Sequence, residues 1–98
     1  MAFVQIIECR TSRIAELQKL DDEWLSATEG RRTLRRSIIA QDRNDPSRYL
    51  VFAFFDSFED AMKNSNLPET GEIAAKMAAL ADGPMVFHDL DVIEDQSF

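Results

Sequence analysis

The sequence predicts an α+β fold in which a four-stranded antiparallel sheet carries its helices on one face. Three observations support this prediction. Residues 49–55 are apolar on both strand faces, residues 14–27 have the apolar spacing of a helix, and turn-forming residues separate the further stretches. With 98 residues, of which 45% are hydrophobic, the chain is predicted to form a single domain, 1–98, around one core.

The first strand and the first helix are predicted in the N-terminal third of the chain. Residues 3–10 form the strand, Thr11 and Ser12 offer N-cap side chains, and Gly30 is suited to end the helix. Apolar side chains at spacings of three and four form one stripe of this helix: Ile14, Leu17, Leu20, Trp24 and Ala27. Residues 21–23, all acidic, fall between the stripe positions and are expected to form a solvated patch.

The second and third strands are predicted to form a hairpin. Residues 33–41 alternate as a strand does, and residues 42–47 are dense in turn formers. Successive side chains of a strand point to opposite faces. Both faces of the third strand are apolar: Tyr49, Val51, Ala53 and Phe55 on one, Leu50, Phe52 and Phe54 on the other. We therefore expect this strand to be covered on both sides.

A broken helix and a last strand complete the predicted order. Ser57 begins a capping box, and residues 64–68 contain a proline that interrupts the helix. A second helix start is expected with Asn66 as its cap. Residues 83–84 end this helix, and residues 85–93 form the fourth strand. Right-handed crossovers turn this βαββαβ order into the ferredoxin-like sheet, with the first and third strands at its centre.

One face of such a sheet lies beyond the reach of the chain's own helices. An exposed apolar area of this size is typical of an interface, so we expect a homodimer in which two sheets pack face to face. The charge distribution agrees with this expectation. Residues 1–50 carry a net charge of +1 and residues 51–98 a net charge of −8, so unlike halves of two protomers can attract each other.

The composition argues against several classes of binding partner and several cellular locations. The net charge of −7 argues against nucleic acid or an anionic membrane as the main partner. No apolar run approaches the roughly 18 residues of a membrane span, and the first residues lack the pattern of a signal peptide. A cytoplasmic protein is therefore expected. The single cysteine, Cys9, has no intrachain partner and is expected to be a small strand residue.

The element order, together with the strand-to-helix junction at residues 54–61 (FFDSFEDA), resembles a known family. It is similar to the antibiotic-biosynthesis-monooxygenase-like (ABM) domains of the dimeric α/β-barrel superfamily. The resemblance spans nearly the whole chain in element order and is specific in residues at that junction. It implies homodimers with a ligand pocket between sheet and helices. Some members are cofactor-free monooxygenases of quinols and polyketide aromatics, some degrade haem, and many have no known activity.

The chain departs from the family pattern at three places. Active members commonly carry a tryptophan where this chain has Phe55, and often a histidine where it has Asn64 and Ser65. Haem-degrading members carry an asparagine on the first strand, and residues 4–10 contain none. A fold by resemblance does not confer a function. The departures therefore leave the activity to be decided by the site itself.

Seven residues are candidates for a site in that pocket. His88, the only histidine, is the candidate general base, and Asn64 the candidate hydrogen-bonding group. The candidate ligand contacts are Trp24, Tyr49, Phe55, Phe58 and Asn66. Each has a purely structural alternative: an interfacial histidine, packed aromatic side chains, or helix caps. No cluster of His, Cys and carboxylates has the spacing of metal ligands, so neither a metal nor another cofactor is expected.

Three functions are open. The first is binding of a small apolar or aromatic molecule between sheet and helices, including monooxygenation in which an electron-rich substrate anion reacts with O₂ unaided. The second is a non-catalytic dimerisation or stress-related binding module. A remote third is an RNA-recognition-type module, which needs a basic surface that the acidic C-terminal half lacks. Four arginines could clamp an anion or pair with acidic residues: Arg31, Arg32, Arg35 and Arg36.

Overall fold

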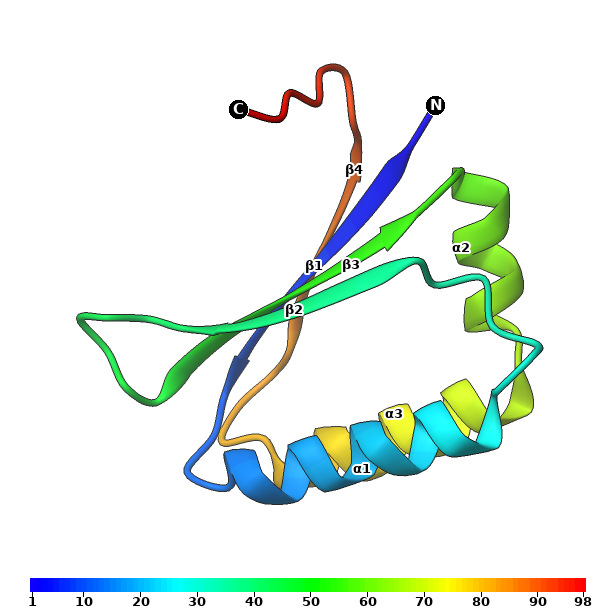
Figure 1. Ribbon diagram of the computed structural model, residues 1–98. Helices are drawn as coiled ribbons and strands as arrows, with labels where there is room; N and C mark the ends of the chain where they lie inside the picture. Colours follow the sequence, from blue (N-terminus) through cyan, green and yellow to red (C-terminus); the bar gives the residue numbers. More distant parts are fainter.

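The computed structural model describes residues 1–98, with seven elements in the order β1-α1-β2-β3-α2-α3-β4 (Figure 1). The strands are β1 (Phe3–Arg10), β2 (Arg36–Gln41), β3 (Arg48–Phe55) and β4 (Val86–Asp91). The helices are α1 (Ile14–Ala27), α2 (Phe58–Ser65) and α3 (Pro68–Leu80). All strand pairs are antiparallel, and the sheet order β2-β3-β1-β4 places β1 and β3 at the centre. The predicted ferredoxin-like α+β fold is confirmed.

Helix α1 begins differently from the prediction. Its N-cap residue is Arg13, which makes no side-chain cap. The hydroxyl of Thr11 instead accepts a hydrogen bond from the Arg13 N–H at 2.9 Å and donates one to the Leu80 carbonyl, also at 2.9 Å. Thr11 is therefore fully buried and connects the start of α1 to the end of α3. Gly30, just beyond the other end of α1, has the positive φ of 79° that glycine adopts readily.

Two strands are shorter than predicted. Strand β2 begins at Arg36 rather than at residue 33, because the Thr33 hydroxyl donates its hydrogen bond to the Asp60 carbonyl of α2. Between Thr33 and Arg36, the backbone joins the sheet only through the Arg35 N–H, 2.9 Å from the Phe54 carbonyl. Strand β4 covers Val86–Asp91 rather than residues 85–93.

The break between α2 and α3 lies within the predicted residues 64–68, but α2 continues to Ser65 and the capping differs. Ser57 caps α2 as predicted, accepting a hydrogen bond from the Asp60 N–H at 3.1 Å. Asn66 is the C-cap of α2 and does not cap α3. The N-cap of α3 is Leu67, which has no side-chain cap, and Pro68 follows at the start of the helix. Proline suits this position because its missing N–H would have no intrahelical partner there.

The three helices lie on one side of the sheet (Figure 1). Helices α1 and α3 pack against each other, and α2 packs against β3 near its C-terminal end. Only 10 of the 98 residues are buried, and six of them lie in two groups. One, at the end of the sheet beside α2, contains Phe3, Phe55 and Ala61. The other lies on the helices and includes Leu17, Trp24 and Ile73. The helix layer and the middle of the sheet therefore do not share one closed core.

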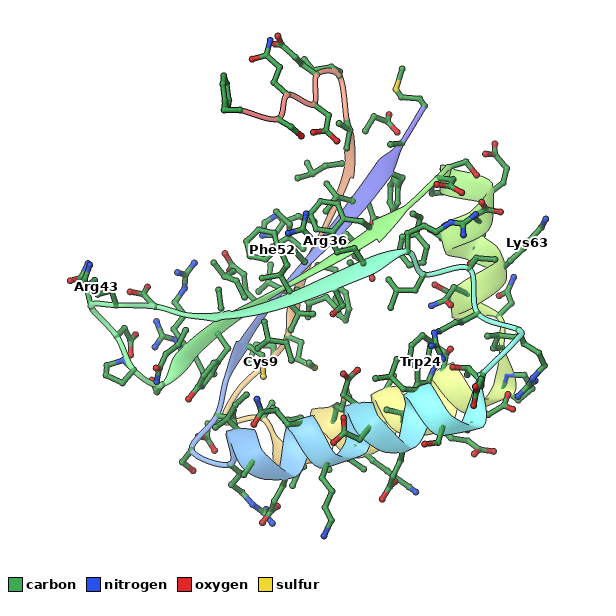
Figure 2. All side chains as sticks on the ribbon, in the orientation of Figure 1. Cys9, Trp24, Arg36, Arg43, Phe52 and Lys63 are labelled. Carbon is green, nitrogen blue, oxygen red and sulfur yellow. The ribbon has the colours of Figure 1, made fainter.

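The middle of the outer face of the sheet, the face turned away from the helices, is apolar and open. Cross-strand neighbours share a face, and the register places Phe52 between Ile6 of β1 and Ile38 of β2. Figure 2 shows Phe52 and Arg36 on the side of the sheet away from α1 and α3. Ile38, Val86 and Leu90 are exposed on this face. None of the helices is both long and apolar enough to span a membrane.

Candidate functional site

A cavity of about 360 Å³ lies between the inner face of the sheet and the helices. Alternate residues of all four strands form one wall, and residues of α1, α2 and α3 form the other. Of its 23 lining residues, 16 are hydrophobic. Figure 2 shows Cys9 of β1 and Trp24 of α1 directed toward this space from opposite sides. Pockets that hold small organic ligands are typically apolar with a few placed polar groups, and they have volumes from about 300 Å³ upward.

The structure brings four of the seven candidate residues together. Trp24, Tyr49, Phe55 and Asn64 all line the cavity. The first three lie on predicted elements, and Asn64 lies in the last turn of α2, where the helix break was predicted. Phe58 and Asn66 are not among the lining residues. Phe58 begins α2 and is 47% exposed, with its ring meeting that of Phe3 edge-on at a centroid distance of 5.4 Å. Asn66 serves as the helix cap described above.

His88 lies on the other side of the sheet. It is paired with Ile6 in the register, whereas the next residue along β4, Phe87, lines the cavity. Its side chain is 46% exposed, and its Nε2 lies 3.7 Å from Oε1 of Glu8. Because the sheet separates His88 from the cavity, the position of His88 does not suit it to act as a base there.

Asn64 offers a free donor to the cavity. The residue is only 8% exposed, and its Oδ1 accepts the Thr33 N–H at 3.4 Å. Its Nδ2 makes no hydrogen bond within the chain. Because every buried side-chain N or O atom has a hydrogen-bond partner, Nδ2 is not one of the buried atoms. The Nδ2 group is therefore accessible and keeps its capacity to donate, in a residue that lines the cavity.

Two aromatic residues of the lining have their polar groups engaged. The indole Nε1 of Trp24 donates to the Thr70 hydroxyl at 2.8 Å, which joins α1 to α3. The Tyr49 hydroxyl accepts from the side chain of Gln41 at 3.2 Å, near the β2–β3 hairpin. Both residues can present the flat, apolar part of their side chains to a ligand without leaving a polar group unpaired.

Asp21 is the functional candidate that the sequence prediction missed. It lines the cavity and is the only charged side chain that does so. Partial burial raises the pKa of its carboxyl above the ordinary value, and the neighbouring Asp22 raises it further, while Arg32 acts in the opposite direction. The sequence did hold a signal: Asp21 follows the buried Leu17 by four residues and precedes the buried Trp24 by three. It therefore belongs to the inward stripe of α1.

Cys9 also lines the cavity but is poorly suited to act as a nucleophile. The thiol is buried, and its pKa is raised by that burial and then by Asp82. A thiol with a raised pKa holds less of the reactive thiolate at neutral pH. Cys9 is therefore a wall residue of the cavity.

The four arginines at 31–36 do not converge on one site. Each has its own contact: Arg31 with Glu69, Arg32 with the Leu25 carbonyl, Arg35 with Asp56, and Arg36 with the ring of Phe54. Two of them thus pair with carboxylates of the acidic C-terminal half within the same chain. The structure contains no group of three or more His, Cys, Asp or Glu side chains that could hold a metal ion.

Asp21 is expected to lower the stability of the fold at neutral pH. Because its pKa is raised on folding, the native state binds more protons there, and stability falls as pH rises through the interval above the ordinary aspartate pKa. We expect Asp21→Asn to raise the free energy of unfolding at about pH 7 by less than about 1 kcal/mol, since the group is only partly buried. Urea denaturation measures this.

The gain in the free energy of unfolding of Asp21→Asn should vanish at about pH 3, where the wild-type carboxyl is neutral in both the folded and the unfolded state. The control is Glu23→Gln, an exposed acidic position of the same helix, which should change little at either pH. An equal loss of stability at both pH values for Asp21→Asn would show that the carboxyl makes a structural hydrogen bond rather than bearing a burial penalty.

No family model and no curated protein matches the sequence. Solved structures do match its fold. A protein of Nitrosomonas europaea with the provisional name antibiotic biosynthesis monooxygenase superposes with a TM-score of 0.78 and 12% identity, over 98% of this chain and 94% of its own. A protein of Caulobacter crescentus with the same provisional name gives 0.80 and 14%, over 95% and 91%.

SnoaB, a cofactor-independent oxygenase from Streptomyces nogalater solved as an asparagine-to-alanine variant, also matches. Its TM-score is 0.80 at 10% identity, over 96% of this chain and 95% of SnoaB. Identities this low are informative about the fold and not about the activity. The chain thus has the fold of the antibiotic-biosynthesis-monooxygenase-like domains, in agreement with the resemblance of its element order and of the junction at residues 54–61.

Proposed function

We propose that this chain binds a small aromatic molecule in the cavity and oxygenates it without a cofactor. The observation that carries the proposal is the make-up of the cavity: apolar walls, one carboxylate on Asp21, and one free amide donor on Asn64. Among the structural neighbours, SnoaB is described as a cofactor-independent oxygenase, which supports the proposal at the level of the fold.

The chemistry asks for a substrate that becomes electron-rich when it loses a proton. A methylene group held between two aromatic rings and opposite a carbonyl, as in an anthrone, is such a carbon acid. Asp21 would accept the proton, and a raised pKa makes the carboxylate a stronger base than an ordinary one. The Asn64 amide would donate a hydrogen bond to the oxygen on which the negative charge collects.

The reaction balances with O₂ as the only co-reactant. The deprotonated carbon gives one electron to O₂, and the resulting radical pair joins to form a C–O bond. After protonation, this hydroperoxide loses water as its O–O bond and the remaining C–H bond break. The methylene carbon is oxidised to a carbonyl, one oxygen atom of O₂ stays on that carbon, and the other leaves as water.

The proposal includes a homodimer formed through the outer face of the sheet. Side chains of that face are apolar and exposed in one chain, which supports burial against a second copy. The cavity lies on the opposite side of the sheet, so two sheets packed together would leave both cavities free.

The test is oxygen consumption with 1,8-dihydroxyanthrone, with the quinone product identified by chromatography. We expect turnover by the wild-type protein and a fall in kcat of about 100-fold or more for Asp21→Asn, since a positioned base typically contributes that much. Glu23→Gln, exposed on the same helix, should keep the wild-type rate. A rate no higher than that of the protein-free solution would refute the activity. Loss of activity in His88→Ala, but not in Asp21→Asn, would show that His88 rather than Asp21 is the general base.

A non-catalytic binding protein is the second candidate, and one observation favours it. His88, the only histidine, lies outside the cavity, so the residue type that most often acts as a general base is absent from it. Tight binding of the anthrone without oxygen consumption would support this alternative.

A further inference from the structure

We infer that Asp21 makes the cavity selective for uncharged aromatic molecules with a hydroxyl group and closes it to aromatic carboxylates and phosphates. This inference rests on the proposed binding function and names its ligand class. It follows from the charges that surround the cavity and from which of its polar groups remain free.

The cavity offers an anion no positive partner. Its lining contains no lysine, arginine or histidine. The guanidinium of Arg32, which acts on Asp21 from nearby, is not part of the lining and donates to the Leu25 carbonyl at 2.8 Å. Arg31, at the same end of α1, pairs with Glu69.

The amide and indole donors of the lining are engaged, with one exception. The Gln5 amide donates to Asp89 at 3.0 Å, and the Trp24 indole donates to Thr70 at 2.8 Å. Asn64 Nδ2 is the amide donor that remains. The other donors of the lining are the neutral hydroxyls of Ser37, Tyr49, Ser65 and Thr70. A carboxylate or phosphate is bound most strongly by cationic donors, and the lining supplies none.

Besides this lack of cationic partners, the negative charge of Asp21 repels an anionic ligand. Two negative charges a few ångströms apart in a partly apolar site repel strongly, because little water screens them. Asp22, the next residue, adds a second negative charge near the same end of the cavity. A neutral hydroxyl, in contrast, can donate a hydrogen bond to the Asp21 carboxylate, and a charged acceptor makes this bond stronger than one between neutral groups.

A matched pair of ligands tests the inference by isothermal titration calorimetry. 2-Naphthol and 2-naphthoate share one ring system and differ in charge at neutral pH. We expect the wild-type protein to bind 2-naphthol at least about tenfold more tightly. Asp21→Asn should reduce this ratio severalfold, mainly through tighter binding of naphthoate. Glu23→Gln should keep the wild-type ratio.

A wild-type ratio near one, or binding of neither ligand, would overturn the inference without any variant. An unchanged ratio in folded Asp21→Asn would do the same. Neither ligand carries the reactive methylene, so the ratio is independent of turnover. A protein that keeps the ratio but consumes no oxygen with the anthrone refutes the monooxygenase proposal alone. A protein that turns over the anthrone but whose Asp21→Asn variant keeps the full ratio refutes this inference alone.

Discussion

Phe52→Glu is expected to convert the proposed homodimer to a folded monomer of 11.2 kDa at micromolar concentration. Phe52 lies on the outer face between Ile6 and Ile38, at the middle of the apolar area proposed to meet a second copy. A carboxylate there would be buried without a partner in the dimer, and a twofold axis would bring in a second one. Burying an unpaired charge costs several kcal/mol, which exceeds the stability of most small interfaces.

Light scattering after size-exclusion chromatography measures the change. Lys63→Glu is the control, because it adds negative charge on the exposed surface of α2, away from the outer face of the sheet (Figure 2). The monomer should stay folded, since Phe52 is only half-buried in one chain. A wild-type protein that is already monomeric at micromolar concentration would remove the homodimer from the proposal. A dimer that survives Phe52→Glu would place the interface elsewhere.

One end of the same outer face carries a charged network that can set the orientation of such a dimer. Arg48 donates to Glu8 at 2.9 Å and to Asp42 at 3.0 Å, and His88 lies beside Glu8. These groups are partly exposed and satisfied within one chain. Their contribution to affinity is therefore expected to be small, with the apolar residues around Phe52 supplying most of it.

The fold could be predicted because its signals are local and repeat. Apolar alternation in strands, helical spacing in residues 14–27 and turn formers at residues 42–47 each specify an element, and together they leave one plausible sheet order. The ends of elements were less predictable. Thr33 lies outside β2 because its hydroxyl donates a hydrogen bond to the Asp60 carbonyl. This is a tertiary contact, which no local sequence pattern reveals.

The site was only half predictable, for a physical reason. Alternation tells which residues share a strand face, but both faces of this sheet are apolar. The pattern therefore does not tell which face meets the helices. His88 shares its phase with Val86 and Leu90, and an apolar side could have been either the cavity or the outer face. The helices decide it, because the strand phase that contains Tyr49 and Phe55 faces them.

Asp21 was missed for the opposite reason. An acidic residue beside two others is typical of a solvated surface patch. The prediction followed this residue type rather than the helical spacing of Asp21 from Leu17 and Trp24. The spacing was the better guide to the position of Asp21: a carboxyl in the inward stripe of a helix costs stability, which makes it a candidate for a functional site. Asn64, predicted as a candidate from its place near the helix break, lies in the last turn of α2 and lines the cavity.

Phe55→Ala is expected to lower the free energy of unfolding by about 3–5 kcal/mol, the usual cost of removing a buried aromatic ring. Phe55 is 6% exposed and packs with Phe3 and Ala61 in the group that joins α2 to the sheet. Its ring centroid lies 6.4 Å from that of Phe3. Because Phe55 also lines the cavity, its removal would extend that empty space into the core instead of letting the core close around a small void.

Phe58→Ala is the matched control. Its ring also contacts Phe3, but it is 47% exposed, so its loss should cost about 0.5–1.5 kcal/mol, the range of an aromatic pair. Urea denaturation followed by circular dichroism compares the two variants. Domains of this size are stable by about 5–15 kcal/mol, so Phe55→Ala should remove a large part of the total. Equal losses in the two variants would show that the contact with Phe3, rather than burial of Phe55 between sheet and α2, holds this end of the fold together.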